Sequence, residues 1–172
     1  MLLCLRDEGG ENMTVDGTMA FCQDIKLDLE DVVLLALSFE LKSPQMGEFT
    51  RTGWIDGWKA LKCDSLQGME AALPRLRSRL QNDRAFFRSI YIYAFDFART
   101  AGQRSIPIDN AKAFWAMLLP AGFAGDALRH EGSGEGWRPE YIQWWFDFLD
   151  AKGGKGISRD TWNMVCAAFI RK

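Results

Sequence analysis

The segment from Asp83 to Arg99 constrains the fold most, because its pattern predicts a helix that is apolar on two faces. The first face carries Phe86, Ile90, Tyr93, Ala94 and Phe97. The second face carries Phe87, Tyr91, Phe95 and Ala98. A helix with two apolar faces is usually covered by neighbours on both sides. We therefore expect this helix to be the centre of the core.

The chain is long enough, and aromatic enough, to bury a sizeable core. It has 172 residues, within the usual size of one or two globular domains, and we interpret it as one. Seven Trp and twelve Phe allow several helices to bury large side chains against one another. The 21 basic and 23 acidic residues give a net charge of -2, which argues against broad electrostatic attraction to nucleic acid or to an anionic membrane.

The cysteines and the single histidine do not predict a metal site or a cofactor. Cys4, Cys22, Cys63 and Cys166 are far apart in the sequence. His130 is the single histidine of the sequence, so cysteines at this spacing cannot complete a zinc-finger ligand set with it. We expect reduced, mostly buried thiols, with disulfides as the alternative. The longest apolar run, Val32 to Leu37, is far shorter than the roughly 18 residues of a membrane span, so we expect a soluble protein of the cytoplasm and nucleus.

A second apolar segment, Val32 to Leu41, follows two acidic residues. Glu30 and Asp31 suit a first helical turn, and Ser43 and Pro44 end the segment. The β-branched residues at its start leave a buried strand open as an alternative. Helix is favoured because the flanking residues carry no hairpin signal.

Further helix starts are predicted from polar and proline positions. The segment from Thr50 to Leu61 has the spacing of an amphipathic helix, and Ser65 caps another that reaches about Leu80, with Pro74 as a kink or a break. All of these segments point to an all-α fold.

The C-terminal part predicts three helices separated by glycine-rich sequence. Asp109 can cap a helix from Asn110 to Leu119, and Ser158 can cap the last helix. Pro139 suits the first turn of the helix between them. Its apolar residues are Tyr141, Trp144, Trp145, Phe148 and Leu149. The glycine-rich stretch from Pro120 to Arg138 is expected to be a mobile surface loop.

Two stretches are similar to the calcium-binding loops of EF-hands, Asp7 to Thr18 and Asp150 to Thr161. In the second, Ile157 occupies the usual apolar position. Both end in Thr where a bidentate Glu is needed, and Gly9 and Lys152 stand at early ligand positions. We therefore expect helix pairs of EF-hand shape that do not bind calcium.

Catalytic constellations are weak in this sequence. A hydrolase built on His130 is one candidate, but the glycine-rich surroundings would hold its imidazole poorly. The neighbouring acids Asp147 and Asp150, or Glu30 and Asp31, could pair as general acid and base, although such pairs are more often solvated faces. We expect no catalytic residue.

Several sequence blocks together resemble a known family. The N-terminal blocks are Met13-Thr-Val-Asp-Gly-Thr, Phe21-Cys-Gln-Asp and Lys42-Ser-Pro-Gln-Met-Gly-Glu-Phe-Thr. The later blocks are Cys63-Asp-Ser, Phe95-Asp-Phe-Ala-Arg with Gly102-Gln, and Ile157-Ser-Arg-Asp-Thr-Trp-Asn. Their order and spacing resemble the PONY domain of the defective-in-cullin-neddylation family over most of the chain, from Met13 to Phe169.

The resemblance implies a single domain at 13–172, preceded by an N-terminal extension at 1–12 and lacking the C-terminal end of the family domain. It also implies a non-catalytic scaffold in cullin neddylation. Such a scaffold holds the modifier-charged conjugating enzyme close to the winged-helix subdomain of a cullin, and proximity with orientation is a recognised source of rate enhancement. The implied partners are therefore a cullin and the N-terminally acetylated conjugating enzyme.

The resemblance further implies a pocket for the acetylated N-terminus. Matched position by position, its walls are Val15, Thr18, Leu34, Leu37, Phe49, Phe97, Phe114 and Met117. On spacing alone the Phe and Leu residues among them would be interpreted as core. Thr18 is more polar than the family pattern, and Met46 stands near the rim where some members have glutamine.

Asp160 matches the first member of the acidic patch with which the family binds cullin. On its own it also suits the first turn of a helix, where a carboxylate interacts favourably with the helix dipole. Both interpretations stay open. The alternative function is an EF-hand-like helical adaptor that binds another helix or N-terminal peptide.

Overall fold

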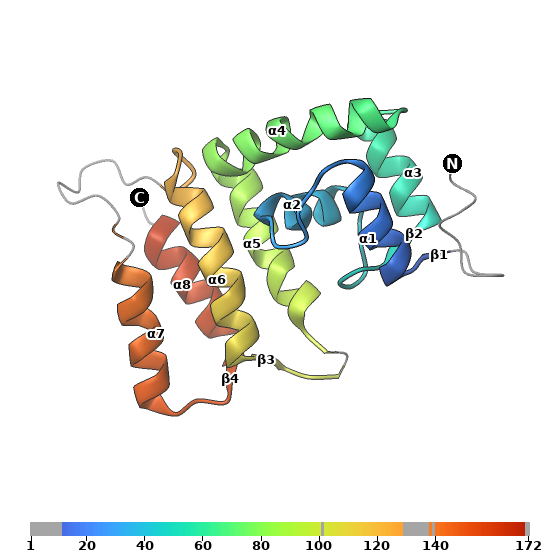
Figure 1. Ribbon diagram of the computed structural model, residues 1–172. Coiled ribbons are helices and arrows are strands. Elements are labelled where there is room, and N and C mark those ends of the chain that lie inside the picture. Colours follow the sequence, from blue (N-terminus) through green and yellow to red (C-terminus); the bar gives the residue numbers. More distant parts are fainter. Residues whose placement is uncertain (1–11, 101, 129–137, 139, 171–172) are drawn as a thin grey trace. The chain divides into compact units, whose positions relative to one another are not determined.

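The computed structural model describes residues 12–100, 102–128, 138 and 140–170, and most of them are helical (Figure 1). This confirms the predicted all-α class. The chain folds into two compact units, one up to Ser78 and the other from Arg79. No helix in the described ranges is long and apolar enough to cross a membrane.

The first unit pairs two very short strands with helices. Its elements are β1 (Asn12–Met13), α1 (Val15–Asp24), α2 (Val32–Glu40), β2 (Phe49–Thr50), α3 (Arg51–Ala60) and most of α4 (Leu66–Asn82). Strands β1 and β2 are antiparallel, with Met13 opposite Phe49. The predicted helix at 50–61 is confirmed, since the Thr50 hydroxyl accepts a hydrogen bond from Gly53 N at 3.1 Å.

Helix α2 confirms the helical interpretation of its segment and excludes the strand. Asp31 is its N-cap and accepts a hydrogen bond from Val33 N at 2.9 Å, so Glu30 precedes the helix and does not lie in its first turn. The helix ends at Glu40, before the predicted stop, and Lys42 takes a positive φ of 53°.

Aromatic packing and two glycines bring α1, α2 and α3 together. The ring of Trp54 lies 4.6 Å from that of Phe21 and 5.6 Å from that of Phe49, both edge to face. A Cβ at Gly53 would lie 2.3 Å from the Leu41 carbonyl oxygen, and one at Gly57 would lie 2.7 Å from that of Glu40. Glycine is therefore needed for the close approach of α3 to the end of α2.

Helix α4 begins as predicted but is not broken at Pro74. The Ser65 hydroxyl accepts from Gly68 N at 3.2 Å, and the helix runs without interruption from Leu66 to Asn82. Proline removes a single backbone donor. Ala72 and Leu76, two residues before and after it, are buried.

The second unit is built from two helix–strand–helix pairs. Its elements are α5 (Arg84–Ala98), β3 (Ser105–Pro107), α6 (Ile108–Phe123), α7 (Glu140–Lys152), β4 (Gly156–Ser158) and α8 (Arg159–Ile170). Strands β3 and β4 are antiparallel, and the buried residues Ile106 and Ile157 are opposite each other (Figure 1). This pairing of two loop strands is the arrangement expected of EF-hand-like helix pairs.

Helix α5 is the centre of the second unit, as its two apolar faces predicted. Six of its side chains are buried, namely Phe86, Phe87, Ile90, Tyr91, Ala94 and Phe95. Tyr93 and Phe97 are only half-buried. Helices α6 and α8 both pack against α5.

Helix α6 differs from its prediction at both ends. It begins at Ile108 after an N-cap Pro107, so Asp109 lies inside the first turn and does not cap it. It continues through Pro120 to Phe123, after which Ala127 and Leu128 are fully buried. The Leu128 amide donates to the Gly122 carbonyl oxygen at 3.1 Å.

The expected mobile surface loop at 120–138 is therefore wrong for its first part. Apolar side chains there pack back onto the helices, which composition alone could not predict. Residues 129–137, with His130, and Pro139 lie outside the described residues.

The described cysteines Cys22, Cys63 and Cys166 are free and buried, as predicted. Burial raises the pKa of the Cys22 and Cys166 thiols to about 11 each. Within the described ranges, no group of three His, Cys, Asp or Glu side chains is arranged to hold a metal ion.

Candidate partner-binding site

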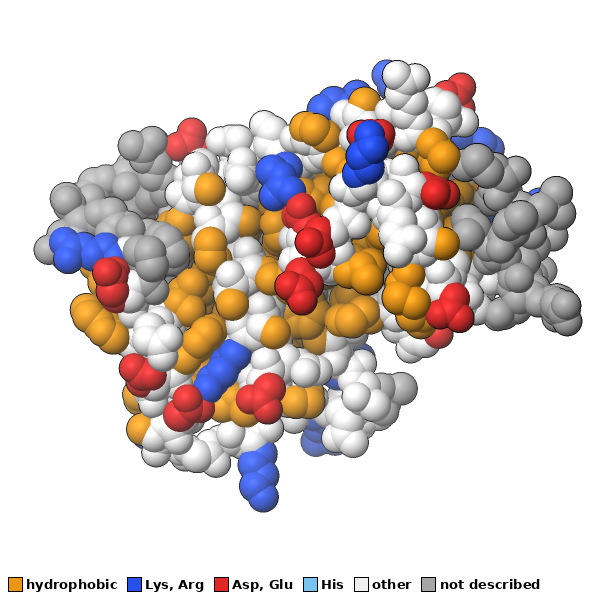
Figure 2. Space-filling view, in the orientation of Figure 1, with side chains coloured by type: hydrophobic (Ala, Val, Ile, Leu, Met, Phe, Trp, Pro, Cys, Tyr) orange, Lys and Arg blue, Asp and Glu red, His pale blue; other side chains and the backbone are white. Residues whose placement is uncertain are grey.

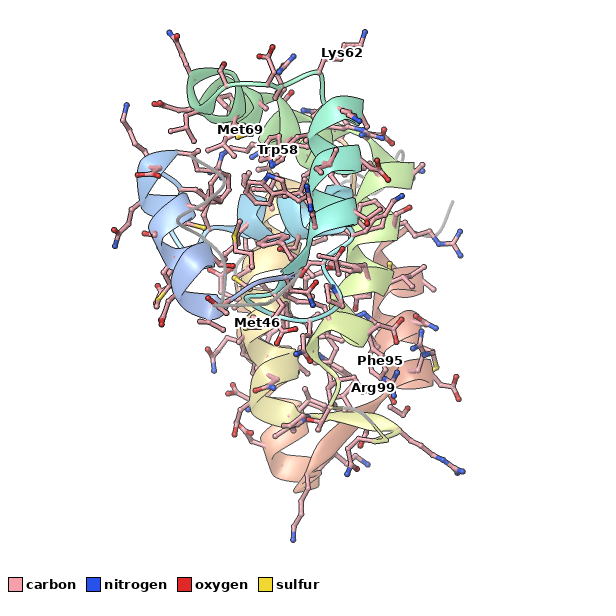
Figure 3. All side chains as sticks on the ribbon, turned by 90° about the vertical axis from the view of Figure 1, so that its right-hand side faces the viewer. Met46, Trp58, Lys62, Met69, Phe95 and Arg99 are labelled. Atoms are coloured by element: carbon pink, nitrogen blue, oxygen red, sulfur yellow. The ribbon has the colours of Figure 1, made fainter. Side chains whose placement is uncertain are left out.

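The N-terminus of α8 is held by a cap and by an ion pair to α5. The Ser158 hydroxyl accepts a hydrogen bond from Thr161 N at 3.2 Å, which confirms the predicted cap. The Arg159 guanidinium pairs with the Asp96 carboxylate and lies 4.9 Å over the ring of Phe95. Figure 3 labels Phe95 on α5 and Arg99, the C-cap residue that follows this helix. These contacts fix the direction of the first turn of α8.

Asp160 is exposed at this position. The nearby bases Arg159 and Arg99 both lie close to another acid, Asp96. Arg159 forms an ion pair with Asp96, and the Arg99 Nε lies 3.6 Å from it. Among the described residues, no hydrogen bond or ion pair joins the Asp160 side chain to another group. Its carboxylate is therefore presented to solvent with the helix dipole behind it, and is available to a basic partner.

An apolar pocket of about 270 Å³ lies between α6, α7 and α8. Its lining residues are Leu119, Tyr141, Ile142, Trp145, Thr161, Met164 and Val165. Thr161 follows Asp160 directly, so the exposed carboxylate is next in the chain to a residue that lines the pocket. An apolar hollow with few polar groups suits a hydrophobic side chain of a protein partner better than a polar substrate.

The acidic pairs considered for catalysis have structural roles instead. Asp31 caps α2 and forms an ion pair with Arg77, and Asp150 forms an ion pair with Lys112. Asp147 accepts a hydrogen bond from the Gln143 side chain at 2.8 Å. Bound in this way, these carboxylates are poorly placed for acid–base chemistry.

The predicted pocket residues of the first unit fall into two groups. Val15 and Thr18 lie on α1 beside the loop at Gly47, where the Thr18 hydroxyl donates to the Gly47 carbonyl oxygen at 2.8 Å. A Cβ at Gly47 would lie 3.0 Å from a methyl carbon of Val15. The polarity of Thr18 is thus satisfied within the fold. Met46, next in this loop, is exposed (Figure 3).

The remaining predicted pocket residues are more enclosed. Leu37 and Phe49 of the first unit are buried, and Leu34 is half-buried. In the second unit Phe114 is buried and Met117 is half-buried. Half-buried Phe97 packs against Tyr93 with their rings 5.2 Å apart. The pocket for an acetylated N-terminus stays a prediction.

Sequence reasoning missed the pocket between α6, α7 and α8. Its aromatic residues Tyr141 and Trp145 were recognised only as the apolar positions of a helix. A signal was present, because five of the thirteen residues of α7 are aromatic. A single buried face of a short helix cannot accommodate so many aromatic side chains, and within α7 only Leu149 is buried.

The described residues are thus mostly helical, with an exposed carboxylate and an apolar pocket in the second unit. Residues 68–172 match the model of a protein family described as Cullin binding. The chain belongs to this family, that of the defective-in-cullin-neddylation proteins, which confirms the resemblance seen in the sequence blocks.

The similar proteins come from fungi and animals. The chain is 31% identical to defective in cullin neddylation protein 1 of Mycosarcoma maydis, over 90% of this chain and 55% of that protein. It is 38% identical to DCN1-like protein 4 of Drosophila melanogaster, over 88% of this chain and 54% of the relative. With DCN1-like protein 5 of Homo sapiens it shares 42% identity over 60% of this chain and 44% of the relative. The chain thus spans about half the length of these relatives.

Proposed function

We propose that this chain takes part in cullin neddylation as a non-catalytic scaffold, and that its second unit binds the cullin. The observation that carries the proposal is the exposed carboxylate of Asp160 at the start of α8, inside the region that matches the cullin-binding family. A charge on a rigid helix terminus is a defined contact for a Lys or Arg of the partner. The apolar pocket beside it would accept a hydrophobic side chain.

The second partner in the proposal is the conjugating enzyme that carries the modifier. Its acetylated N-terminus would contact the pocket residues named above, from Val15 to Met117. An acetyl cap matters because an unacetylated amino group would place an unpaired positive charge in an apolar environment. Holding both partners orients the conjugating enzyme toward a cullin lysine, and no nucleophile of the scaffold is needed.

Charge reversal at Asp160 tests the cullin contact. We expect Asp160→Lys to weaken cullin binding strongly, because like charges then face each other, and Asp160→Ala to weaken it less. Both variants should stay folded, since an exposed carboxylate in a first helical turn contributes little to stability. Isothermal titration with a cullin winged-helix subdomain at low and high salt gives the affinities, and the difference should shrink as salt rises.

Asp24→Lys is the matched control, because Asp24 is also exposed but lies at the end of α1, outside the region that matches the family. Unchanged cullin affinity of Asp160→Lys at low salt would leave Asp160 only a helix-terminus residue.

Two half-buried residues test the contact with the conjugating enzyme. We expect Leu34→Ala and Phe97→Ala to weaken binding of a peptide that copies its acetylated N-terminus, and the unacetylated peptide to bind the parent chain more weakly. Circular dichroism checks that both variants are folded. If they are folded and bind the peptide as tightly as the parent, the pocket assignment is wrong. The adaptor for another helix or N-terminal peptide is then the better interpretation.

A further inference from the structure

Helix α7 carries a row of residues on its surface that its own unit does not cover. Glu140, Trp144, Phe148 and Lys152 follow one another at intervals of four, so they lie along one side of the helix. Trp144 is 65% exposed and Phe148 is 49% exposed. Figure 2 shows hydrophobic and acidic side chains side by side on the surface over α7, at the lower left. Large aromatic side chains left in water at adjacent turns indicate a protein-binding surface.

The row adjoins the pocket between α6, α7 and α8, because the Trp144 ring lies 5.4 Å from that of Tyr141 and the Phe148 ring lies 5.6 Å from that of Trp145. On α7 the pocket uses Tyr141, Ile142 and Trp145, which point to the neighbouring side of the helix. The buried side, marked by Leu149, faces farther round. The flanking acid Asp150 is held by Lys112, and Asp147 accepts from Gln143. Only Asp150 is paired with a base, so the exposed Asp147 carboxylate lies beside the row, and Glu140 and Lys152 are the charges within the row itself.

The order of residues along the row is self-complementary. It runs acid, aromatic, aromatic, base, with Glu140 in the first turn and Lys152 in the last. An identical row read in the opposite direction runs base, aromatic, aromatic, acid. Two copies that meet antiparallel would therefore place Glu140 against Lys152 at both ends and Trp144 against Phe148 in the middle. The Lys152 ammonium already lies 5.5 Å over the Phe148 ring, toward the centre of the row.

We propose that the α7 row is a homodimer interface, in which the row of one copy binds the row of a second copy about a two-fold axis. Residues four apart form a ridge on a helix, and such a ridge can pack along the surface of a facing helix. The contact is isologous, so it closes after two copies and builds no filament. Charge complementarity favours a second copy as the partner, because the acid and the base of the row lie at positions that face each other in an antiparallel contact.

The association of the full chain tests this proposal. Sedimentation equilibrium should give an average mass that rises with concentration from the 19.5 kDa of one chain toward twice that value. Trp144→Ala should raise the dimer dissociation constant by more than about tenfold, because a central aromatic side chain dominates such an interface. A parent that stays at the mass of one chain over the whole concentration range would overturn the proposal.

Charge reversal gives the sharper test. Glu140→Lys puts Lys opposite Lys at both ends, and Lys152→Glu puts Glu opposite Glu, so each single change acts twice in a two-fold dimer. Either variant alone should dissociate at least about tenfold more readily than the parent. Their equimolar mixture should dimerise again, because every contact then joins Lys with Glu. The variant that carries both changes should dimerise by itself.

Lys155→Glu is the control, since this exposed lysine lies beyond the end of α7 and should leave association unchanged. Circular dichroism confirms the fold of each variant. If the equimolar mixture fails to dimerise while the parent does, the antiparallel pairing is wrong. If the Trp144→Ala variant dimerises as tightly as the parent, the row is not the dimer interface. If the chain is monomeric and Trp144→Ala lowers only its cullin affinity, the row binds the cullin and not a second copy. Cullin binding is measured separately with Asp160→Lys, so failure of one proposal is distinguishable from failure of the other.

Discussion

Tyr91 is fully buried in the second unit, yet its hydroxyl group both donates and accepts a hydrogen bond. It donates to the Trp162 carbonyl oxygen at 2.9 Å and accepts from the Trp115 Nε1 at 2.7 Å. Its ring stacks on that of Trp162 with the centroids 4.6 Å apart. Burial raises the pKa of Tyr91 far above its usual value of 10.0, so the hydroxyl stays neutral. One hydroxyl thus joins α5, α6 and α8.

We expect Tyr91→Phe to lower the free energy of unfolding by about 1 to 3 kcal/mol, because it leaves the buried Trp115 indole N–H without its acceptor. Urea denaturation followed by tryptophan fluorescence measures the change. Tyr141→Phe is the matched control, since Tyr141 is only half-buried beside the apolar pocket. An equal loss in the two variants would mean that the Tyr91 hydroxyl bonds do not stabilise the core.

At the scale of single elements, two aspartates near helix starts have different roles. Asp83 is the N-cap of α5, and its carboxylate accepts a hydrogen bond from Phe86 N at 3.0 Å. This backbone hydrogen bond is the main cause that lowers the pKa of Asp83 below its usual 3.8. Asp109 does not cap α6, because this helix begins at Ile108 and its N-cap position is occupied by Pro107. Asp109 therefore lies inside the first turn.

We expect Asp83→Ala to destabilise the chain by about 1 kcal/mol at pH 7, as loss of an N-cap typically does, and Asp109→Ala to cost less. A lowered native pKa stabilises the fold above the unfolded pKa, and this stabilisation is lost as pH falls through the native pKa. The cost of Asp83→Ala should therefore shrink below about pH 4. Thermal melts of both variants at several pH values measure it, and a cost independent of pH would contradict the ionised cap.

At the scale of the whole molecule, the two helix–strand–helix pairs of the second unit bear on the predicted absence of calcium binding. Strands β3 and β4 join the two pairs of the second unit through Ile106 and Ile157. In the stretch from Asp150 to Thr161, however, the first carboxylate pairs with Lys112, and Thr161 belongs to the first turn of α8. In the described residues, strand pairing and the burial of Ile106 and Ile157 hold the two helix pairs together.

We expect thermal melts in calcium and in chelator to coincide, because calcium needs six to eight oxygen ligands and these stretches offer far fewer. Circular dichroism at 222 nm follows the helices directly. A calcium-dependent rise in Tm would show that one of the two stretches binds the ion, and replacing Asp150 by Ala would then identify which.

The sequence by itself determined most of the helices, because their signals are local. Thr50, Ser65 and Ser158 cap the helices that follow them, and the two apolar faces of 83–99 predict a central helix that the structure confirms. Family membership followed from short blocks in the right order. The place of Asp160 in the first turn of the last helix was also predicted from sequence, and its contact with a cullin stays a proposal.

Only the tertiary structure decided which apolar side chains are covered. Trp144 and Trp162 are the same residue type, each within a helix that the sequence predicts, yet Trp144 is 65% exposed and Trp162 is 0% exposed. The same holds for Leu128, which the composition of its segment placed in a loop and the fold buries. Periodicity shows which side of a helix is apolar, but the residues that cover that side come from distant parts of the chain. The pocket between α6, α7 and α8 and the exposed row on α7 arise because distant residues bury some apolar side chains of these helices and leave others exposed.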